Sequence, residues 1–310
     1  KLKMLGKVTK LQLILDEAEK VIKGQRDVLT AILSAIIADG HILLEGPTGV
    51  GKTTIALTFS RLLGLSFKRI QFTSDLLPSD VLGTYYYNAK AGEFSLRKGP
   101  IFANLVLIDE INRASPKTQS ALIEVMEEKQ VTIEGNTLHL EKPFIVIATQ
   151  NPLDYAGTFP LPITQLDRFL LKINMDYPSK EVEKEILKTG DPRSLVESLN
   201  QVMSKEEVLD WQERVPKVIV DESIIDYITE IVTATRNNHL IKEGLSSRAS
   251  IHILKCAKAR ALINGRDYVI PEDVKSMFLY VAPHRIICDI PQCDLQIFLR
   301  DFIESIPVPR

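Results

Sequence analysis

Residues 46–53 read Gly46-Pro47-Thr48-Gly49-Val50-Gly51-Lys52-Thr53 and match the pattern GxxxxGK[ST]. The apolar run Ile42–Leu44 precedes them and the good helix formers of Lys52–Leu63 follow, so we expect strand, loop and helix in succession. Such a loop turns backbone N–H groups toward phosphates at the positive end of a helix. Lys52 is then expected to reach the β- and γ-phosphates and the Thr53 hydroxyl to ligate Mg²⁺. The flanking strand and helix disfavour a chance glycine-rich turn, and the segment predicts a phosphate-binding loop.

Two acidic residues follow a second apolar run. Leu105–Ile108 is expected to be a buried strand, and Asp109 and Glu110 come directly after it. Because ligands bind at the carboxyl ends of the strands in parallel sheets, both acids are expected beside the phosphate-binding loop. We expect Asp109 to hold magnesium and Glu110 to orient and polarise the attacking water. Acids that merely solvate a strand end are the alternative, which the neighbouring loop disfavours.

A third apolar run, Phe144–Ala148, ends in Thr149-Gln150-Asn151-Pro152. This places the Asn151 amide near the same crevice, where it would hold the water or the γ-phosphate. An Asn-Pro pair is also an ordinary turn signal, and without the other motifs we would prefer that interpretation. The sequence has no Asn-Lys-x-Asp segment, the usual guanine-recognition motif, so ATP is favoured over GTP.

Short apolar runs alternate with helical stretches, which is typical of a parallel sheet covered on both faces. Phe67–Phe72 and Phe169–Ile173 are further expected strands, and Leu11–Asp39 is expected to form two helices separated by a turn at Gly24. Two hairpins are expected as insertions, at Gly83–Leu96 and Val131–Leu140.

From Pro178 onward, apolar residues recur only at helical spacing. The fold class is therefore predicted as α/β, followed by an all-helical domain. We expect a helical lead-in at residues 1–20, the α/β nucleotide-binding domain at residues 21–177 and the helical domain at residues 178–310.

The composition fits a globular protein, with 45% hydrophobic and 25% charged residues among 310. A net charge of −2 gives no general basic field, so nucleic-acid binding is not favoured. Cys256, Cys288 and Cys293 form no CxxC pair and are expected to be reduced thiols. No apolar run approaches the roughly 18 residues of a membrane span, and Lys1–Lys10 lacks the apolar core of a signal peptide. We expect a cytoplasmic protein without a membrane span.

Longer segments, in order along Val21 to Val281, resemble the MoxR family of AAA+ ATPases. They are Val21-Ile22-Lys23-Gly24-Gln25, GPTGVGKTT at Gly46–Thr54, DLLPSDVLG at Asp75–Gly83, KGPIFANLVLIDEINRASPKTQSALIEVMEE at Lys98–Glu128, ATQNP at Ala148–Pro152, GTFPLP at Gly157–Pro162, QLDRFL at Gln165–Leu170 and GRDYVIPEDV at Gly265–Val274. The resemblance implies a P-loop AAA+ α/β domain with a parallel sheet, a hairpin inserted in its second helix, a hairpin before the sensor strand, and a helical lid.

The resemblance also implies roles for single residues. Asn151 corresponds to sensor 1, Arg168 to the arginine finger given to a neighbouring subunit, and Arg248 to sensor 2 at the start of a lid helix. Val21, Ile22 and Gln25 are expected to line the adenine pocket, and Thr54 to join the phosphate-binding loop. The sequence departs from the family at Gly244–Ala249, where GASPRA is usual, and at Leu161–Thr164, where LPEA is usual. Both arginines are kept, so these departures concern local geometry.

In function, the resemblance implies an ATPase that uses ATP and Mg²⁺ and remodels or matures partner proteins as a chaperone. It further implies a homo-oligomeric ring, a hexamer, and a partner protein with a von Willebrand A domain. Two alternatives stay open. A nucleic-acid-stimulated AAA+ motor would share the inserted hairpins and would show ATPase activity that depends steeply on salt. A nucleotide-gated scaffold would bind ATP with little turnover, which intact Glu110, Asn151 and Arg168 disfavour.

Some charged and aromatic residues have no assigned role. Arg113 follows the acidic strand and is either a second inter-subunit arginine or an ordinary surface residue, which is the commoner case. Lys68, Arg69, Arg97 and Lys98 are expected to solvate a face rather than to bind nucleic acid. Tyr85–Tyr87, on the first hairpin, is expected either to contact a client protein or to pack on its own domain.

Overall fold

The computed structural model describes residues 9–90, 92–152, 157–291 and 294–309. Its first half alternates helices and strands, as the apolar runs predict. The elements of this half are α1 (Lys10–Val21), α2 (Arg26–Ile37), β1 (Ile42–Glu45), α3 (Lys52–Leu62), β2 (Phe67–Gln71), α4 (Pro78–Leu82), β3 (Gly83–Asn88), β4 (Glu93–Lys98), β5 (Leu105–Asp109), the 3-10 helix η1 (Ile111–Arg113), α5 (Pro116–Glu128), β6 (Gln130–Ile133), β7 (Asn136–His139), β8 (Ile145–Gln150), α6 (Ile163–Leu166) and β9 (Leu171–Asn174).

Five of these strands form one parallel sheet in the order β2-β5-β8-β1-β9. The strand β5 is buried at every position, and its residues alternate between two separate hydrophobic cores. Leu105 and Leu107 belong to the core shared with α1, α2 and α3, while Val106 and Ile108 belong to the core shared with α5. Successive side chains of a strand point to opposite faces, so the sheet is covered by helices on both faces. The predicted α/β fold is confirmed.

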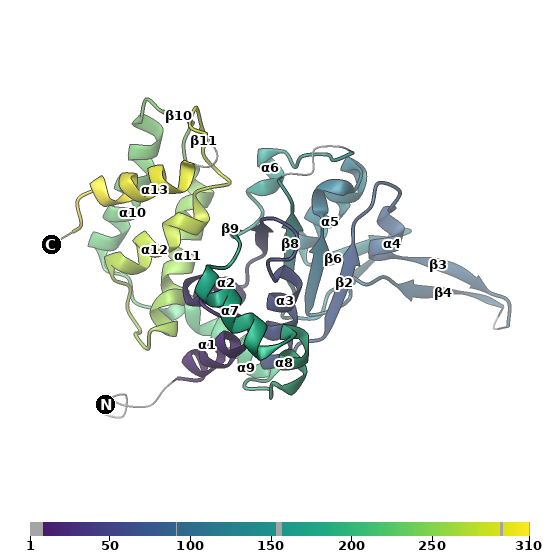
Figure 1. Ribbon diagram of the computed structural model, residues 1–310. Helices are drawn as coiled ribbons and strands as arrows, with labels where there is room; N and C mark the ends of the chain where they lie inside the picture. The colour runs from purple at the N-terminus through teal and green to yellow at the C-terminus, as the bar shows by residue number, and fades with distance from the viewer. Residues whose placement is uncertain (1–8, 91, 153–156, 292–293, 310) are drawn as a thin grey trace.

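Both predicted hairpins are present as two-stranded antiparallel sheets of their own, β3–β4 and β6–β7. The β3–β4 hairpin projects away from the five-stranded sheet, at the opposite end of the molecule from helices α10 to α13 (Figure 1). Tyr87 and Phe94 stack edge to face across this hairpin, with ring centroids 5.6 Å apart, and both are exposed.

The second half is mainly helical, as expected. Its elements are α7 (Lys180–Thr189), α8 (Pro192–Ser198), α9 (Lys205–Arg214), the 3-10 helix η2 (Val215–Lys217), α10 (Glu222–Asn237), β10 (Ile241–Glu243), α11 (Ser247–Ile263), α12 (Pro271–Val281), β11 (Ile287–Cys288) and α13 (Leu295–Ser305). The sequence did not indicate the short antiparallel pair β10–β11, because strands of three and two residues are too short to show a period of two.

One hydrophobic core continues from α1–α3 through α11, α12 and α13. Helix α8 packs on α3 and α1, and α9 packs on α2, so the helices that follow residue 177 contact the α/β domain directly. The boundaries at residues 20, 177 and 178 stay predictions. Residues 1–8 of the lead-in and Cys293 lie outside the described residues. Among the described helices, none has both the length and the apolar character to cross a membrane.

Candidate nucleotide-binding and hydrolysis site

The loop between β1 and α3 has a backbone that only glycine accommodates easily. Gly49 and Gly51 have φ of 88° and 89°, in the left-handed region that disfavours side chains, and a Cβ at either would meet none of the described residues within 4 Å. A Cβ at Gly46 would instead lie 2.3 Å from the carbonyl oxygen of Met175. The loop is thus shaped by close backbone packing at its start and opens toward free space at its tip.

Lys52, at the start of α3, folds back over this loop. Its Nζ donates hydrogen bonds to the carbonyl oxygens of Gly46 at 2.5 Å and Pro47 at 3.1 Å. Partial burial lowers the pKa of Lys52, and the nearby carboxylates of Asp109, Glu110 and Glu45 oppose that shift. A lysine that is partly desolvated among acids is well placed to compensate the negative charge of phosphates.

Asp109 ends the buried strand β5 and is itself only 7% exposed. Its Oδ1 accepts a hydrogen bond from Thr149 Oγ1 at 3.2 Å, and its Oδ2 pairs with Arg69 Nε at 2.5 Å. Thr149 Oγ1 also accepts from the backbone N–H of Glu110 at 3.0 Å. Because β5 and β8 are parallel neighbours, these contacts join the carboxyl ends of two strands, as the sequence predicts.

Glu110 follows Asp109 with a φ of 58°, a left-handed conformation that is uncommon for a residue other than glycine. Its Oε2 accepts a hydrogen bond from Gln71 Nε2 at 2.9 Å and pairs with Arg113 Nε at 2.8 Å. Arg113 therefore forms an ion pair with the Glu110 carboxylate of its own chain.

These residues surround a pocket of about 410 Å³ at the carboxyl edge of the sheet. Asn151, directly after β8, lines the pocket as the sequence predicts. The lining residues are Thr48, Gly49, Gly51, Lys52, Thr53, Thr54, Arg69, Gln71, Asp109, Glu110, Thr149, Asn151 and Arg193.

The sequence analysis missed four of the lining residues, which are Arg69, Gln71, Thr149 and Arg193. Arg69 was expected to solvate a face, but it lines the pocket and pairs with Asp109, because its strand β2 lies beside β5 with Gln71 opposite Asp109. The sequence does not reveal this strand order, so neither Arg69 nor Gln71 could be assigned to the pocket from the sequence. Arg193 comes from α8, and no motif marks it.

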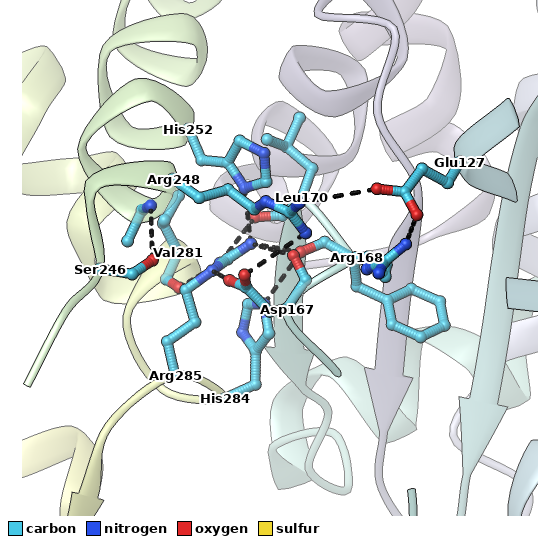
Figure 2. A network of polar contacts seen from close by, with 12 residues as sticks. Glu127, Asp167, Arg168, Leu170, Ser246, Arg248, His252, Val281, His284 and Arg285 are labelled. Carbon is cyan, nitrogen blue, oxygen red and sulfur yellow. Dashed lines mark hydrogen bonds and ion pairs between the residues drawn. The ribbon is translucent and has the colours of Figure 1, made fainter. Parts of the chain in front are cut away.

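Arg168 and Arg248 lie outside this pocket and beside each other (Figure 2). Arg168 forms an ion pair with Glu127, near the end of α5. Arg248, on the first turn of α11, lies 3.6 Å from Glu127 Oε1 and 3.6 Å from Asp167 Oδ2. The structure thus gathers the predicted arginine finger and the predicted sensor 2 arginine into one cluster, away from the pocket of the same chain.

The predicted adenine-binding residues lie at the junction of α1 and α2. Val21 and Ile22 are buried at the end of α1, and Gln25 precedes α2. These three residues do not line the pocket described above. Gln25 Oε1 is a buried acceptor without a hydrogen-bond partner among the described residues, which suits a donor such as an exocyclic amine.

The residues present fit Mg-ATP. The glycine backbone at Gly49 and Gly51 opens into the pocket, and the cations Lys52 and Arg69 face it. The hydroxyl of Thr53 and the carboxylate of Asp109 are hard oxygen donors, the ligand type that Mg²⁺ prefers. Fold and pocket together define a P-loop nucleotide-binding protein of the AAA+ class.

Comparisons with known proteins agree with this class and narrow it. The family described as "ATPase family associated with various cellular activities (AAA)" matches residues 41–171, and the family described as "AAA lid domain" matches residues 233–300. Chaperone MoxR1 of Mycobacterium tuberculosis is 41% identical, over 92% of this chain and 77% of its own. The chain belongs to the MoxR family of AAA+ ATPases.

Two further similarities cover nearly the whole chain. Protein YeaC of Bacillus subtilis is 46% identical over 95% of this chain and 93% of its own. A crystal structure from Cytophaga hutchinsonii, of a protein described as a candidate ATPase, superposes with a TM-score of 0.87 at 39% identity. The superposition covers 97% of this chain and 95% of the Cytophaga hutchinsonii chain.

Proposed function

We propose that this chain hydrolyses Mg-ATP to ADP and phosphate, and that the cycle remodels a bound partner protein. The observation that carries the proposal is the convergence of Lys52, Asp109, Glu110 and Asn151 on one pocket beside a glycine-rich loop. Phosphoryl transfer needs mainly positioning and charge stabilisation, and the pocket offers groups for both.

Each group has a distinct task in this proposal. Thr53 and Asp109 hold the magnesium ion, which when bound neutralises charge on the phosphate oxygens. Lys52 compensates the β- and γ-phosphates. Glu110, oriented by Gln71 and Arg113, polarises the attacking water, and Asn151 holds that water or the γ-phosphate. Val21, Ile22 and Gln25 receive the adenine.

The cluster of Arg168 and Arg248 supplies the remaining positive charge, at the pocket of a neighbouring subunit. Within the described part of the chain, Arg168, Arg248 and the neighbouring Arg285 pair with two carboxylates, Glu127 and Asp167, so these three cations exceed their paired anions by one positive charge. The side chains of Arg168 and Arg248 are 30% and 43% exposed, which leaves them within reach of an anion on another molecule. A γ-phosphate presented by the next subunit is an anion of the required kind.

We therefore propose a head-to-tail ring, of six copies by family resemblance, in which each subunit completes its neighbour's site. The relative named chaperone MoxR1 supports a role in remodelling or maturing other proteins. A partner with a von Willebrand A domain is proposed on family resemblance alone. Among the described residues, Cys256 and Cys288 are free thiols, which suits a reducing compartment and supports the proposal of a cytoplasmic location.

Replacing Lys52 with Ala tests the pocket assignment. The variant loses the cation that compensates the β- and γ-phosphates, so ATP affinity and turnover should both fall while the fold is kept. Calorimetric titration with ATP and a phosphate-release assay measure the two quantities. Near-normal hydrolysis by Lys52→Ala would show that the reaction takes place elsewhere.

A further inference from the structure

A guanidinium group lies buried behind the cluster of Arg168 and Arg248. The side chain of Arg285, between α12 and β11, is only 2% exposed. An arginine has five N–H donors and no acceptor, and burying its charge is costly unless the donors are satisfied. Burial lowers the pKa of Arg285, and the Asp167 carboxylate opposes that shift.

Arg285 donates most of its hydrogen bonds to one short segment of the chain, residues 167–170 (Figure 2). Nε donates to Asp167 Oδ1 at 2.7 Å. Nη2 donates to the carbonyl oxygens of Asp167 at 3.1 Å and Phe169 at 2.6 Å, and Nη1 donates to that of Leu170 at 3.3 Å. The remaining contacts, to Val281 O and His252 Nδ1, stay within the helical half of the chain.

Two histidines complete the arrangement in neutral form. His252 accepts from Arg285 through Nδ1, and His284 Nε2 donates to the carbonyl oxygen of Phe169 at 3.0 Å. Burial and the Arg285 charge lower the pKa of His252 to about 3 and that of His284 well below its usual value. Neither ring therefore adds a charge that would repel Arg285 near neutral pH.

The segment held in this way contains Arg168. Its backbone accepts hydrogen bonds on both sides of Arg168, at Asp167 and at Phe169, while the Arg168 side chain pairs with Glu127. Asp167 also lies 3.6 Å from Arg248, so the buried guanidinium orients a carboxylate that contacts the second arginine of the cluster. We infer that Arg285 is a positioning residue, which holds the arginine finger Arg168 for the neighbouring subunit's ATP and couples the lid to that finger.

This inference rests on the proposed function, because it assigns Arg285 a task only through Arg168. A purely structural role is the competing explanation, since a buried arginine that bridges two halves of a chain also stabilises the fold. The two explanations predict different effects of substituting Arg285. If Arg285 positions the finger, a substitution impairs only the subunit that supplies Arg168. If Arg285 mainly stabilises the fold, a substitution impairs a subunit both when it supplies Arg168 and when it supplies the pocket.

The test uses mixed rings of two inactive chains. Lys52→Ala is the donor chain, with a dead pocket and an intact finger, and Arg168→Ala is the acceptor chain, with an intact pocket. In random one-to-one head-to-tail rings, about a quarter of all sites combine a working pocket with a working finger, so ATPase activity should return to about that level. Arg285→Lys is then added either to the donor chain or to the acceptor chain. Lysine keeps the positive charge but cannot reproduce the planar set of N–H groups of a guanidinium.

With Arg285→Lys in the donor, we expect the restored activity to fall about 10- to 100-fold, as a misplaced catalytic group commonly causes. With Arg285→Lys in the acceptor, we expect it to be kept. The matched control is Arg266→Lys in the donor. Arg266 is a lid arginine that pairs with both oxygens of Asp273, at 2.7 and 2.8 Å, and its substitution should leave the restored activity unchanged.

A second measurement is independent of turnover. The Arg285→Lys variant should bind a fluorescent ATP analogue as tightly as the wild type does, because its own pocket is intact. ATP should nevertheless promote self-association of this variant less than that of the wild type, and the same is expected of Arg168→Ala. Sedimentation velocity with and without ATP measures that association.

Activity lost in both placements, kept in both, or lost only in the acceptor would overturn the positioning role. So would unaltered ATP-driven association of Arg285→Lys alongside impaired association of Arg168→Ala. If the unmodified donor and acceptor restore nothing in rings shown to be mixed, action of Arg168 in trans fails, and the role of Arg285 fails with it.

Discussion

Gln71 Nε2 donates a hydrogen bond to Glu110 Oε2 at 2.9 Å, which joins the ends of strands β2 and β5. Arg113 Nε lies 2.8 Å from the same oxygen. Oε2 of Glu110, the carboxylate proposed to activate water, is thus held by Gln71 on the neighbouring strand and by Arg113 on the 3-10 helix that follows. This anchoring gives Glu110 a defined orientation despite its place in a left-handed turn.

Glu110→Gln should bind ATP as the wild type does but hydrolyse it very slowly. The glutamine keeps an oxygen that accepts from Gln71 and Arg113, so the local shape is retained, but it lacks the charge that polarises water. A fall in turnover of about 100-fold or more is expected. Single-turnover kinetics and a nucleotide-binding titration separate the two effects. Equal loss of binding would instead place Glu110 among the metal ligands.

Arg193→Ala should weaken ATP binding several-fold with little change in turnover at saturating ATP. Arg193 brings a positive charge to the pocket from α8, and exposed charge contacts of this kind are worth about 1 kcal/mol or less. The measurement is the dissociation constant for ATP at low and high salt, with Arg193→Lys as the control that keeps the charge. An unchanged constant at low salt would mean that Arg193 does not reach the nucleotide.

Stability should fall as pH drops below about 6.5, and His41 should account for part of the loss. His41 Nδ1 accepts from the backbone N–H of Val146 at 3.0 Å, and Nε2 contacts the carbonyl oxygen of Met126 at 2.9 Å, so the ring must stay neutral. Burial lowers its pKa from 6.5 to about 4. Between these values the unfolded chain binds the proton and the folded chain does not, which costs about 1.4 kcal/mol per pH unit.

Urea unfolding at pH 7, 6 and 5 measures this loss. His41→Gln should be less stable at pH 7, since Val146 loses its acceptor, but its stability should depend less on pH. His139→Gln, on the exposed face of β7, is the control and should keep the wild-type slope. The same pH dependence in His41→Gln and the wild type would rule out His41 as a source.

The fold was largely predictable from the sequence, because its central strands are fully buried and read as continuous apolar runs. Leu105–Asp109 and Ile42–Glu45 are buried at every position, and each ends beside a motif. The pair β10–β11 was not predictable, since its two short strands carry no periodic pattern. The packing of α8 and α9 on the first three helices depends on long-range contacts that local spacing does not encode.

At the candidate site, residues within contiguous motifs were predictable and residues brought in by topology were not. Lys52 begins the helix after the glycine-rich loop, Asp109 ends β5 and Asn151 directly follows β8, and all three line the pocket. Arg69 enters the pocket only because β2 is the neighbour of β5 in the sheet. Arg285 lies more than a hundred residues from the segment that it holds, and a single buried arginine leaves no mark in the sequence pattern.

The most direct test of a site completed by a neighbouring subunit is the hydrolysis rate per chain across a dilution series, with the mass of the particles measured by light scattering in the same buffer. A head-to-tail assembly dissociates on dilution, so the rate per chain should fall in step with the mass. Arg168→Ala should stay about a thousandfold below the assembled wild type at every concentration, because an arginine finger contributes about that much. A full hydrolysis rate from particles with the mass of one chain would contradict the proposal.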